Sequence, residues 1–165
     1  MNNETIFGVV KDKEYMEQAI VHAQAAYAAE EVPVGAVVVD ENGEIIGWGS
    51  NTVEQEQSQY AHAEVHALAM AGKKKRDWRL QDCWLYVTLE PCIMCMGLLY
   101  LSRVQGVVFG ASSPMFGAHS HKDIFPQMYK NNMLIVIGGV CKLQTRELLR
   151  QFFQQQRKKG EQKKS

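Results

Sequence analysis

No apolar run in this 165-residue sequence approaches the roughly twenty residues that a membrane-spanning helix needs. The first ten residues lack a basic start followed by a long apolar stretch, so we expect no secretory signal and a cytoplasmic protein. Internal repeats and low-complexity linkers are absent as well. Hydrophobic residues make up 46% and charged residues 22%, which is typical of a soluble globular enzyme. The length indicates a single domain, residues 1–165, whose core needs no disulfide bonds.

Cysteine is scarce, with four in the chain. Thiols stay reduced in the cytoplasm, where a Cys-x-x-Cys pair binds metal or does redox chemistry more often than it forms a disulfide. Cys92 and Cys95 form such a pair. Cys83 and Cys141 lie in or beside apolar, strand-like segments, and we expect them to be buried small hydrophobic residues.

Charge is unevenly distributed, although the net charge is zero. The first 64 residues are mainly acidic, whereas residues 142–165 are mainly basic. A basic C-terminal segment could meet the phosphates of a nucleic acid. The alternative is that the basic tail, about 157–165, is a solvated and frayed end of the chain.

Hydrophobic periodicity predicts strands and helices that mostly alternate. Strands are expected at 34–39, 44–48, 84–89, 104–111 and 134–137, and helices at 12–31, 61–71, 94–101, 122–130 and 144–158. Asn42-Gly43 is a strong hairpin signal between the first two strands. Gly35 inside a strand suggests that something approaches the backbone closely, either at a bulge or from a ligand. This order predicts a mixed sheet with helices on its faces.

Two connecting segments carry their own signals. Residues 52–60 are polar and lack periodicity, which predicts a surface loop. Gly72, followed by the basic run 73–76, is predicted to mark the exit of the helix that begins near Ala61.

The residues suited to chemistry fall into two short stretches, His62-Ala63-Glu64 and Pro91-Cys92-Ile93-Met94-Cys95. His62, Cys92 and Cys95 are zinc-type ligands, and a zinc held by three protein groups keeps its fourth position for water, as catalytic sites do. The zinc would lower the pKa of that water, and Glu64 could carry protons to a leaving group. The pattern H-x-E followed by P-C-x-x-C is the signature of zinc nucleobase deaminases.

Both stretches are predicted to open helices. Cys92 and Cys95 are three residues apart, so their thiolates share one side of a first helical turn. His62 and Glu64 begin another helix, and both positive helix ends would then point at one metal.

Other interpretations of these residues fit less well. A redox Cys-x-x-Cys expects a thioredoxin-like context without a matching His-x-Glu helix. A structural zinc site would need a fourth ligand, and none is close in sequence. His66 follows His62 by four residues, but Ala63 stands where the metalloprotease motif has Glu. The remaining histidines are expected to be surface or core residues: His22, His119 and His121.

Sequence blocks around the metal motif resemble bacterial tRNA-specific adenosine deaminases of the TadA family, over most of residues 12–157. The blocks are Glu31-Val32-Pro33-Val34-Gly35-Ala36, Ala61-His62-Ala63-Glu64, Trp78-Arg79-Leu80, Leu85-Tyr86-Val87-Thr88-Leu89-Glu90-Pro91-Cys92, Ser102-Arg103 and Val107-Val108-Phe109-Gly110-Ala111. The resemblance implies a three-layer α/β/α cytidine deaminase-like fold with a mixed five-stranded sheet. It also implies a homodimer, one Zn²⁺ per subunit, and conversion of adenosine to inosine at the wobble position of the tRNA anticodon loop.

Residue by residue, the resemblance implies that His62, Cys92 and Cys95 hold the zinc and that Glu64 is the catalytic proton shuttle. Zinc-bound hydroxide would attack C6 of an adenine splayed out of the anticodon loop. Asn51 matches the Asn expected to hydrogen-bond the target base, and Val34 and Ala63 are further expected substrate contacts.

Two loops depart from the family pattern. Ser58-Gln59-Tyr60 replaces the usual Asp-Pro-Thr, and Ser113 and Met115 replace an Asp and a Lys. Both loops are expected to border the mouth of the site, where Tyr60 or Phe116 could offer a stacking surface, unless the changes are simply tolerated. Two alternatives therefore stay open. One is a deaminase of a free base or nucleotide such as guanine or cytosine, and the other is a non-catalytic zinc-stabilised RNA-binding subunit, against which the presence of Glu64 argues.

Overall fold

The structure is a computed structural model that describes residues 5–121 and 134–162. Its centre is a sheet of strands β1 (Gly35–Val39), β2 (Ile45–Ser50), β3 (Trp84–Leu89), β4 (Gly106–Ala111) and β5 (Ile135–Gly138). The strands lie in the order β2-β1-β3-β4-β5. Strand β1 is antiparallel to β2 and β3, whereas β3, β4 and β5 are parallel. The predicted mixed five-stranded sheet is confirmed.

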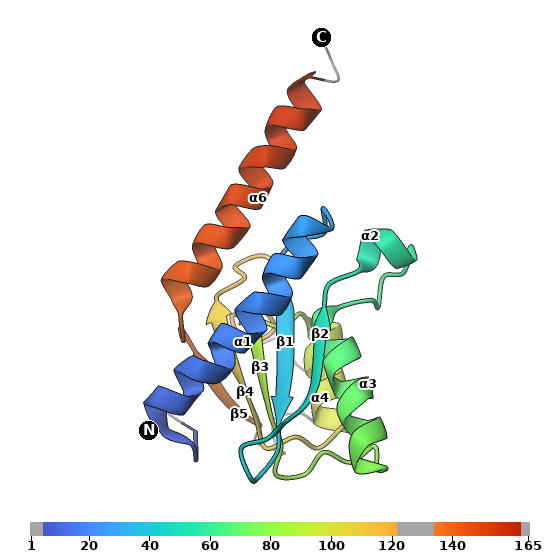
Figure 1. Ribbon diagram of the computed structural model, residues 1–165, viewed down its shortest axis with the longest axis vertical. Coiled ribbons are helices and arrows are strands. Elements are labelled where there is room, and N and C mark those ends of the chain that lie inside the picture. Colours follow the sequence, from blue (N-terminus) through green and yellow to red (C-terminus); the bar gives the residue numbers. More distant parts are fainter. Residues whose placement is uncertain (1–4, 122–133, 163–165) are drawn as a thin grey trace.

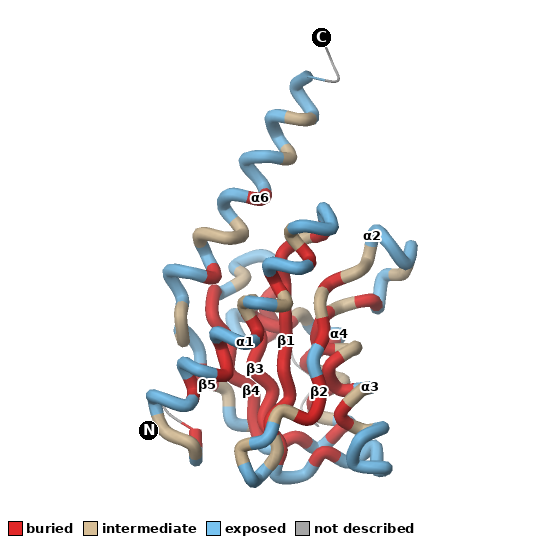
Figure 2. The backbone as a smooth tube through the Cα atoms, in the orientation of Figure 1, coloured by how far each residue is buried: buried red, intermediate tan, exposed pale blue. Residues whose placement is uncertain are grey.

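Helices cover both faces of the sheet, which gives the expected three layers (Figure 1). Helices α1 (Gly8–Ala28) and α6 (Lys142–Gln162) pack on one face, and α3 (Ala63–Lys75) and α4 (Ile93–Leu101) on the other. Val38 and Leu85 face α3 and α4, while Val37 and Tyr86 face α1. Figure 2 shows the central strands buried between these layers. Burial on both faces explains why the strands are continuous apolar runs rather than alternating ones.

Several helix boundaries differ from the predictions. Helix α1 ends at Ala28 rather than 31, because Glu30 has a left-handed φ of 63° and the chain turns before Pro33. The predicted end of α3 at Gly72 is wrong, since the helix continues to Lys75 and stops at Arg76, which has a φ of 55°. Cations are favoured in a last helical turn, so the basic run extends the helix instead of ending it. The helix predicted at 122–130 lies outside the described residues.

A short helix, α2 (Val53–Glu56), lies in the segment predicted to be a loop. The prediction fails because four residues are too few to show a helical period. The helix depends on a distant side chain: the backbone N–H groups of Glu54 and Gln55 donate to the Glu31 carboxylate at 3.2 and 2.7 Å.

Gly35 marks the point where α1 crosses β1. A Cβ at this position would collide with the carbonyl oxygen of Ala19 and the backbone nitrogen of Ala23. The predicted close approach is confirmed, and the approaching group is a helix rather than a bulge or a ligand. Gly43, with a φ of 82°, closes the hairpin as its sequence predicts.

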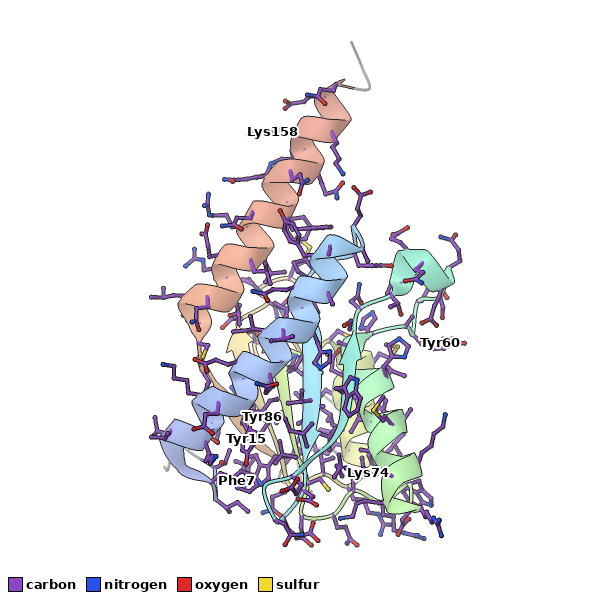
Figure 3. All side chains as sticks on the ribbon, viewed as in Figure 1. Phe7, Tyr15, Tyr60, Lys74, Tyr86 and Lys158 are labelled. Carbon is purple, nitrogen blue, oxygen red and sulfur yellow. The ribbon has the colours of Figure 1, made fainter. Side chains whose placement is uncertain are left out.

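A buried polar cluster fixes the start of α1 against the sheet. The Tyr86 hydroxyl donates to Asp12 Oδ1 at 2.7 Å, and the Thr5 hydroxyl donates to the same oxygen at 2.5 Å. Beside this cluster, the Tyr15 ring contacts the rings of both Phe7 and Tyr86 (Figure 3). The centroid distances are 5.4 Å to Phe7 and 5.1 Å to Tyr86. Burial raises the pKa of the Tyr86 hydroxyl, which keeps it a hydrogen-bond donor to Asp12.

Helix α6 packs on α1 and then projects beyond the sheet (Figure 1). The Tyr27 hydroxyl donates to Gln155 at 2.8 Å, and the Tyr27 and Phe152 rings meet edge to face. The helix takes in residues 157–162 of the basic tail, where Lys159 pairs with Glu30. Among the described residues, no helix is long and apolar enough to cross a membrane.

Candidate metal centre and base pocket

Two helices begin close together, and each begins at a candidate ligand. His62 is the N-cap residue of α3, Cys92 is the N-cap residue of α4, and Cys95 lies in the first turn of α4. His62 Nδ1 lies 3.4 Å from Cys95 Sγ and 3.8 Å from Cys92 Sγ. The three ligand atoms all lie within 4.8 Å of one another. The structure thus brings together the three residues that the sequence analysis singled out, at two converging helix starts.

This donor set fits zinc. Tetrahedral zinc with Cys and His ligands places its donor atoms roughly 3.5 to 3.8 Å apart, which the separations of His62 from the two sulfurs match. Within the described parts of the chain, this is the one group of three or more His, Cys, Asp or Glu side chains that could hold a metal ion. The positive ends of α3 and α4 favour negative charge at the same point.

A hydrogen bond between the Cys92 and Cys95 side chains shifts their pKa values in opposite directions. A hydrogen bond from the Cys95 thiol, followed by one from His62, lowers the pKa of Cys92 to about 4 despite partial burial. The same bond between the thiols raises the pKa of Cys95, and the bond to Cys92 raises the pKa of His62. These contacts favour the thiolate form of Cys92, which is the form in which cysteine binds a metal.

Glu64 is the second residue of α3 and lies beside the ligands, with only 3% of its surface exposed. Burial raises the pKa of its carboxyl group. A carboxyl group that is held so close to the metal ligands, and whose protonated form is favoured by burial, is suited to carry a proton.

A pocket of about 400 Å³ opens beside the ligands, and this volume lies in the range of small-molecule sites. It is lined by Glu31, Val32, Val34, Asn51, Val53, Glu54, His62, Glu64, Leu89, Glu90, Cys92, Ser113 and Phe116. Two of the expected substrate contacts, Asn51 and Val34, are in this wall. The third, Ala63, is fully buried at the start of α3 and is not among the lining residues.

Glu90 is a buried carboxylate for which the sequence predicts no role. It accepts hydrogen bonds from the backbone N–H of Ser113 at 2.8 Å and of Ser120 at 2.6 Å, and from the Ser120 hydroxyl at 2.7 Å. It therefore holds the loop 112–121 over one side of the pocket. Glu31 has the same function on the other side, where it holds α2. Each Glu immediately or shortly precedes a proline, a signal too common to reveal this role.

The other histidines have local partners. His66 Nε2 lies 2.8 Å from the Thr52 hydroxyl and 3.4 Å from a Glu56 carboxylate oxygen, and His66 is not part of the candidate metal group. His22 stacks on Trp48, His119 contacts Phe109, and His121 Nε2 lies 2.7 Å from the carbonyl oxygen of Pro114. These contacts agree with the surface or core roles expected from the sequence.

The other two cysteines differ in burial, and the two aromatic residues expected at the mouth differ in whether they line the pocket. Cys83 is buried as predicted, but Cys141, which has a left-handed φ of 55° just before α6, is only partly buried. Phe116 lines the pocket and remains 70% exposed, whereas Tyr60 is 64% exposed and does not line it. Of the two candidate stacking surfaces, Phe116 is therefore the one that borders the pocket.

Fold and site together define a zinc deaminase: residues 9–111 match the cytidine and deoxycytidylate deaminase zinc-binding region. The tRNA-specific adenosine deaminase of Bacillus subtilis (strain 168) is 42% identical to this chain over 152 residues, which cover 92% of this chain and 94% of that protein. Within the zinc deaminases, the chain therefore belongs to the tRNA-specific adenosine deaminase (TadA) family, and the resemblance noted from the sequence is confirmed.

Solved structures share the fold. One, from a study of A-to-I editing by tRNA:A34 deaminases at the wobble position of transfer RNA, is 33% identical with a TM-score of 0.76, and the match covers 82% of this chain and 98% of that one. A guanine deaminase from Bacillus subtilis is 32% identical with a TM-score of 0.57, over 72% of this chain and 73% of that one. The same fold therefore accompanies two different purine substrates.

Proposed function

We propose that this chain catalyses the hydrolytic deamination of adenosine to inosine and ammonia at the wobble position of a tRNA anticodon loop, in the cytoplasm. The observation that carries the proposal is the grouping of His62, Cys92 and Cys95 beside a pocket that Glu64 also lines and that is large enough to admit a nucleobase. The relatives whose names specify tRNA support the choice of RNA over a free base.

His62, Cys92 and Cys95 would hold one Zn²⁺ per subunit. When bound, zinc supplies a Lewis acid that activates water at neutral pH. Glu64 takes a proton from the attacking water and delivers it to a ring nitrogen of adenine. A bond from oxygen to C6 forms, the bond from C6 to the amino nitrogen breaks, and Glu64 passes the second proton of the water to the departing ammonia.

Three residues are proposed to hold the base after it leaves the anticodon stack. Asn51 hydrogen-bonds the purine edge and Val34 packs against the ring, since both line the pocket. Ala63 is proposed to contribute through its backbone N–H, because the first N–H groups of a helix have no partner within the helix and Ala63 is the first residue of α3.

We further propose that the enzyme acts as a homodimer. Three large apolar side chains of α4 are exposed: Ile93 at 53%, Met94 at 40% and Leu101 at 66%. Exposed apolar side chains gathered on one element favour association. Sedimentation of the purified protein at micromolar concentration would test this, and a monomer would contradict it.

The test of the function is direct. Zinc-loaded full-length protein is incubated with an anticodon stem-loop RNA that carries adenosine at the wobble position, and inosine is measured by mass spectrometry after digestion. An RNA with guanosine at that position is the substrate control. Glu64→Gln should keep its zinc and lose activity by a factor of about 100 or more. If the zinc-loaded wild-type protein forms no inosine, the proposal is wrong.

A second candidate is a deaminase of free purine bases. The guanine deaminase fold neighbour and the replacement of a family Lys by Met115 in the mouth loop favour it. Ammonia release from guanine, cytosine and adenosine, measured beside the RNA assay, separates the two. Rapid turnover of a free base without turnover of RNA would support this second candidate.

A further inference from the structure

Glu31 is 1% exposed, although it carries a carboxylate. Its Oε1 accepts the backbone N–H of Gln55 at 2.7 Å, and its Oε2 accepts the backbone N–H of Glu54 at 3.2 Å. Both donors belong to the short helix α2. Glu31 is therefore held rigidly by main-chain groups before any side chain is considered.

The same Oε2 atom accepts a hydrogen bond from Asn51 Nδ2 at 3.3 Å. Asn51 is 7% exposed and lines the pocket, and its backbone N–H donates to the Val34 carbonyl at 3.0 Å. An ionised carboxylate only accepts hydrogen bonds, whereas an Asn amide has one accepting and one donating end. Reversing the amide would bring two acceptors together in a buried place, which is unfavourable.

We infer that Glu31 is a positioning residue that fixes the orientation of the Asn51 amide and so selects the purine edge that the pocket accepts; this rests on the proposed function of Asn51. One Nδ2 hydrogen is committed to Glu31, which leaves the second hydrogen and Oδ1 for the base. That pair complements the N7 acceptor and the N6 amino donor of adenine.

Glu90 provides a matched comparison. Like Glu31 it is almost fully buried, lines the same pocket and holds a mouth loop through backbone N–H groups. Its hydrogen-bond partners are Ser113 and Ser120, so it does not act on Asn51. The Glu90→Gln substitution measures the loss of activity that follows from removing a buried carboxylate at the mouth. The Glu31→Gln substitution removes a similar carboxylate and also changes the hydrogen bond to the Asn51 amide.

Glu31→Gln keeps the shape of the side chain but converts one acceptor into a donor. The short bond from the Gln55 N–H retains the remaining side-chain oxygen at position 31. The new NH₂ group then takes the place of Oε2, where it faces Asn51 and gives up the longer bond from the Glu54 N–H. Asn51 then turns its Oδ1 toward that NH₂ group. The positions of Oδ1 and Nδ2 relative to the base are thereby exchanged. The variant should process adenosine with kcat/KM lower by a factor of about 10 to 100.

The experiment compares wild type, Glu31→Gln, Glu90→Gln, Asn51→Ala and the Glu31→Gln/Asn51→Ala double variant. Substrates are stem-loop RNAs with adenosine or 7-deazaadenosine at the wobble position, since the latter lacks the N7 acceptor. Wild type and Glu90→Gln should prefer adenosine by about tenfold. Glu31→Gln and Asn51→Ala should lose this preference, and the double variant should show no further loss. Side-chain amide NMR of Asn51, assigned from its absence in Asn51→Ala, reports the orientation without substrate.

The outcomes are separable. Loss of the adenosine preference in Glu31→Gln but not in Glu90→Gln, together with a shifted Asn51 amide resonance in Glu31→Gln, supports the inference. If Glu31→Gln lowers kcat/KM but keeps the wild-type preference, or leaves the Asn51 resonance unchanged, Glu31 is only structural and the inference is overturned. A wild-type protein that forms no inosine overturns the proposed function instead, and the resonance then decides by itself whether Glu31 orients Asn51.

Discussion

The backbone of Gly117 lies directly against the carboxylate of Glu90, and a Cβ at Gly117 would collide with it. Gly117→Ala should push Glu90 away from the N–H groups of Ser113 and Ser120 and loosen the loop 112–121. Losing a buried hydrogen bond costs about 1–3 kcal/mol, so we expect KM for the stem-loop RNA to rise about tenfold. Zinc content should stay at the wild-type level, because the proposed ligands lie at the starts of α3 and α4. A variant with unchanged KM would show that the mouth does not depend on this contact.

Metal binding should depend on Cys95 and not on Cys83. Cys95 lies 3.4 Å from His62 Nδ1, whereas Cys83 is buried beside Lys75. Cys95→Ser should purify with little zinc, while Cys83→Ser should keep about one zinc per chain, measured by atomic emission. Chelation of the wild-type protein should lower its melting temperature, since a bound metal stabilises the folded state by mass action. Equal zinc in both variants would contradict the ligand set.

Stability at high pH should depend on Tyr86. Burial raises its pKa in the folded state above the ordinary value of 10, so the stabilisation is complete below pH 10 and is lost as pH rises above it. Tyr86→Phe removes the hydroxyl bond to buried Asp12 and should lower the free energy of unfolding at pH 8 by about 1–3 kcal/mol. Between pH 10 and 11 the difference in free energy of unfolding between wild type and Tyr86→Phe should become smaller, as measured by urea unfolding. A constant gap would show that the hydroxyl does not titrate as described.

The crossing of α1 over β1 should tolerate no side chain at Gly35. Gly35→Ala forces a Cβ against the backbone of α1 and should lower the free energy of unfolding by about 1–3 kcal/mol or more. Gly160→Ala is the control, since Gly160 lies in α6 with no neighbour near an added Cβ. That change should raise helix stability by about 0.5–1 kcal/mol. Similar effects from both substitutions in chemical denaturation would rule out the close crossing.

Much of the fold follows from local patterns. The run 84–89 is apolar and rich in β-branched and aromatic residues, and it becomes β3 with the predicted bounds. Asn42-Gly43 closes the predicted hairpin with Gly43 in a left-handed conformation. The grouping of His62, Cys92 and Cys95 was also predictable, because the residue types and their spacing are specific to the chemistry.

What the sequence did not reveal depends on contacts between distant segments. Helix α2 has no period of its own and is held by Glu31, more than twenty residues earlier. Glu90 acts on Ser120, thirty residues later, so its role exists only once β3 and the loop 112–121 are folded. No local propensity encodes such pairs, because tertiary partners decide them.

Glu31 and Glu90 hold the two sides of the mouth mainly through main-chain N–H groups. Every residue except proline offers that donor, whatever its side chain. The framework of the mouth is therefore largely indifferent to which side chains its loops carry. Substitutions such as those at Ser113 and Met115 can change what touches the RNA without dismantling the support beneath it, so substrate preference in this fold can drift while the metal chemistry stays constant.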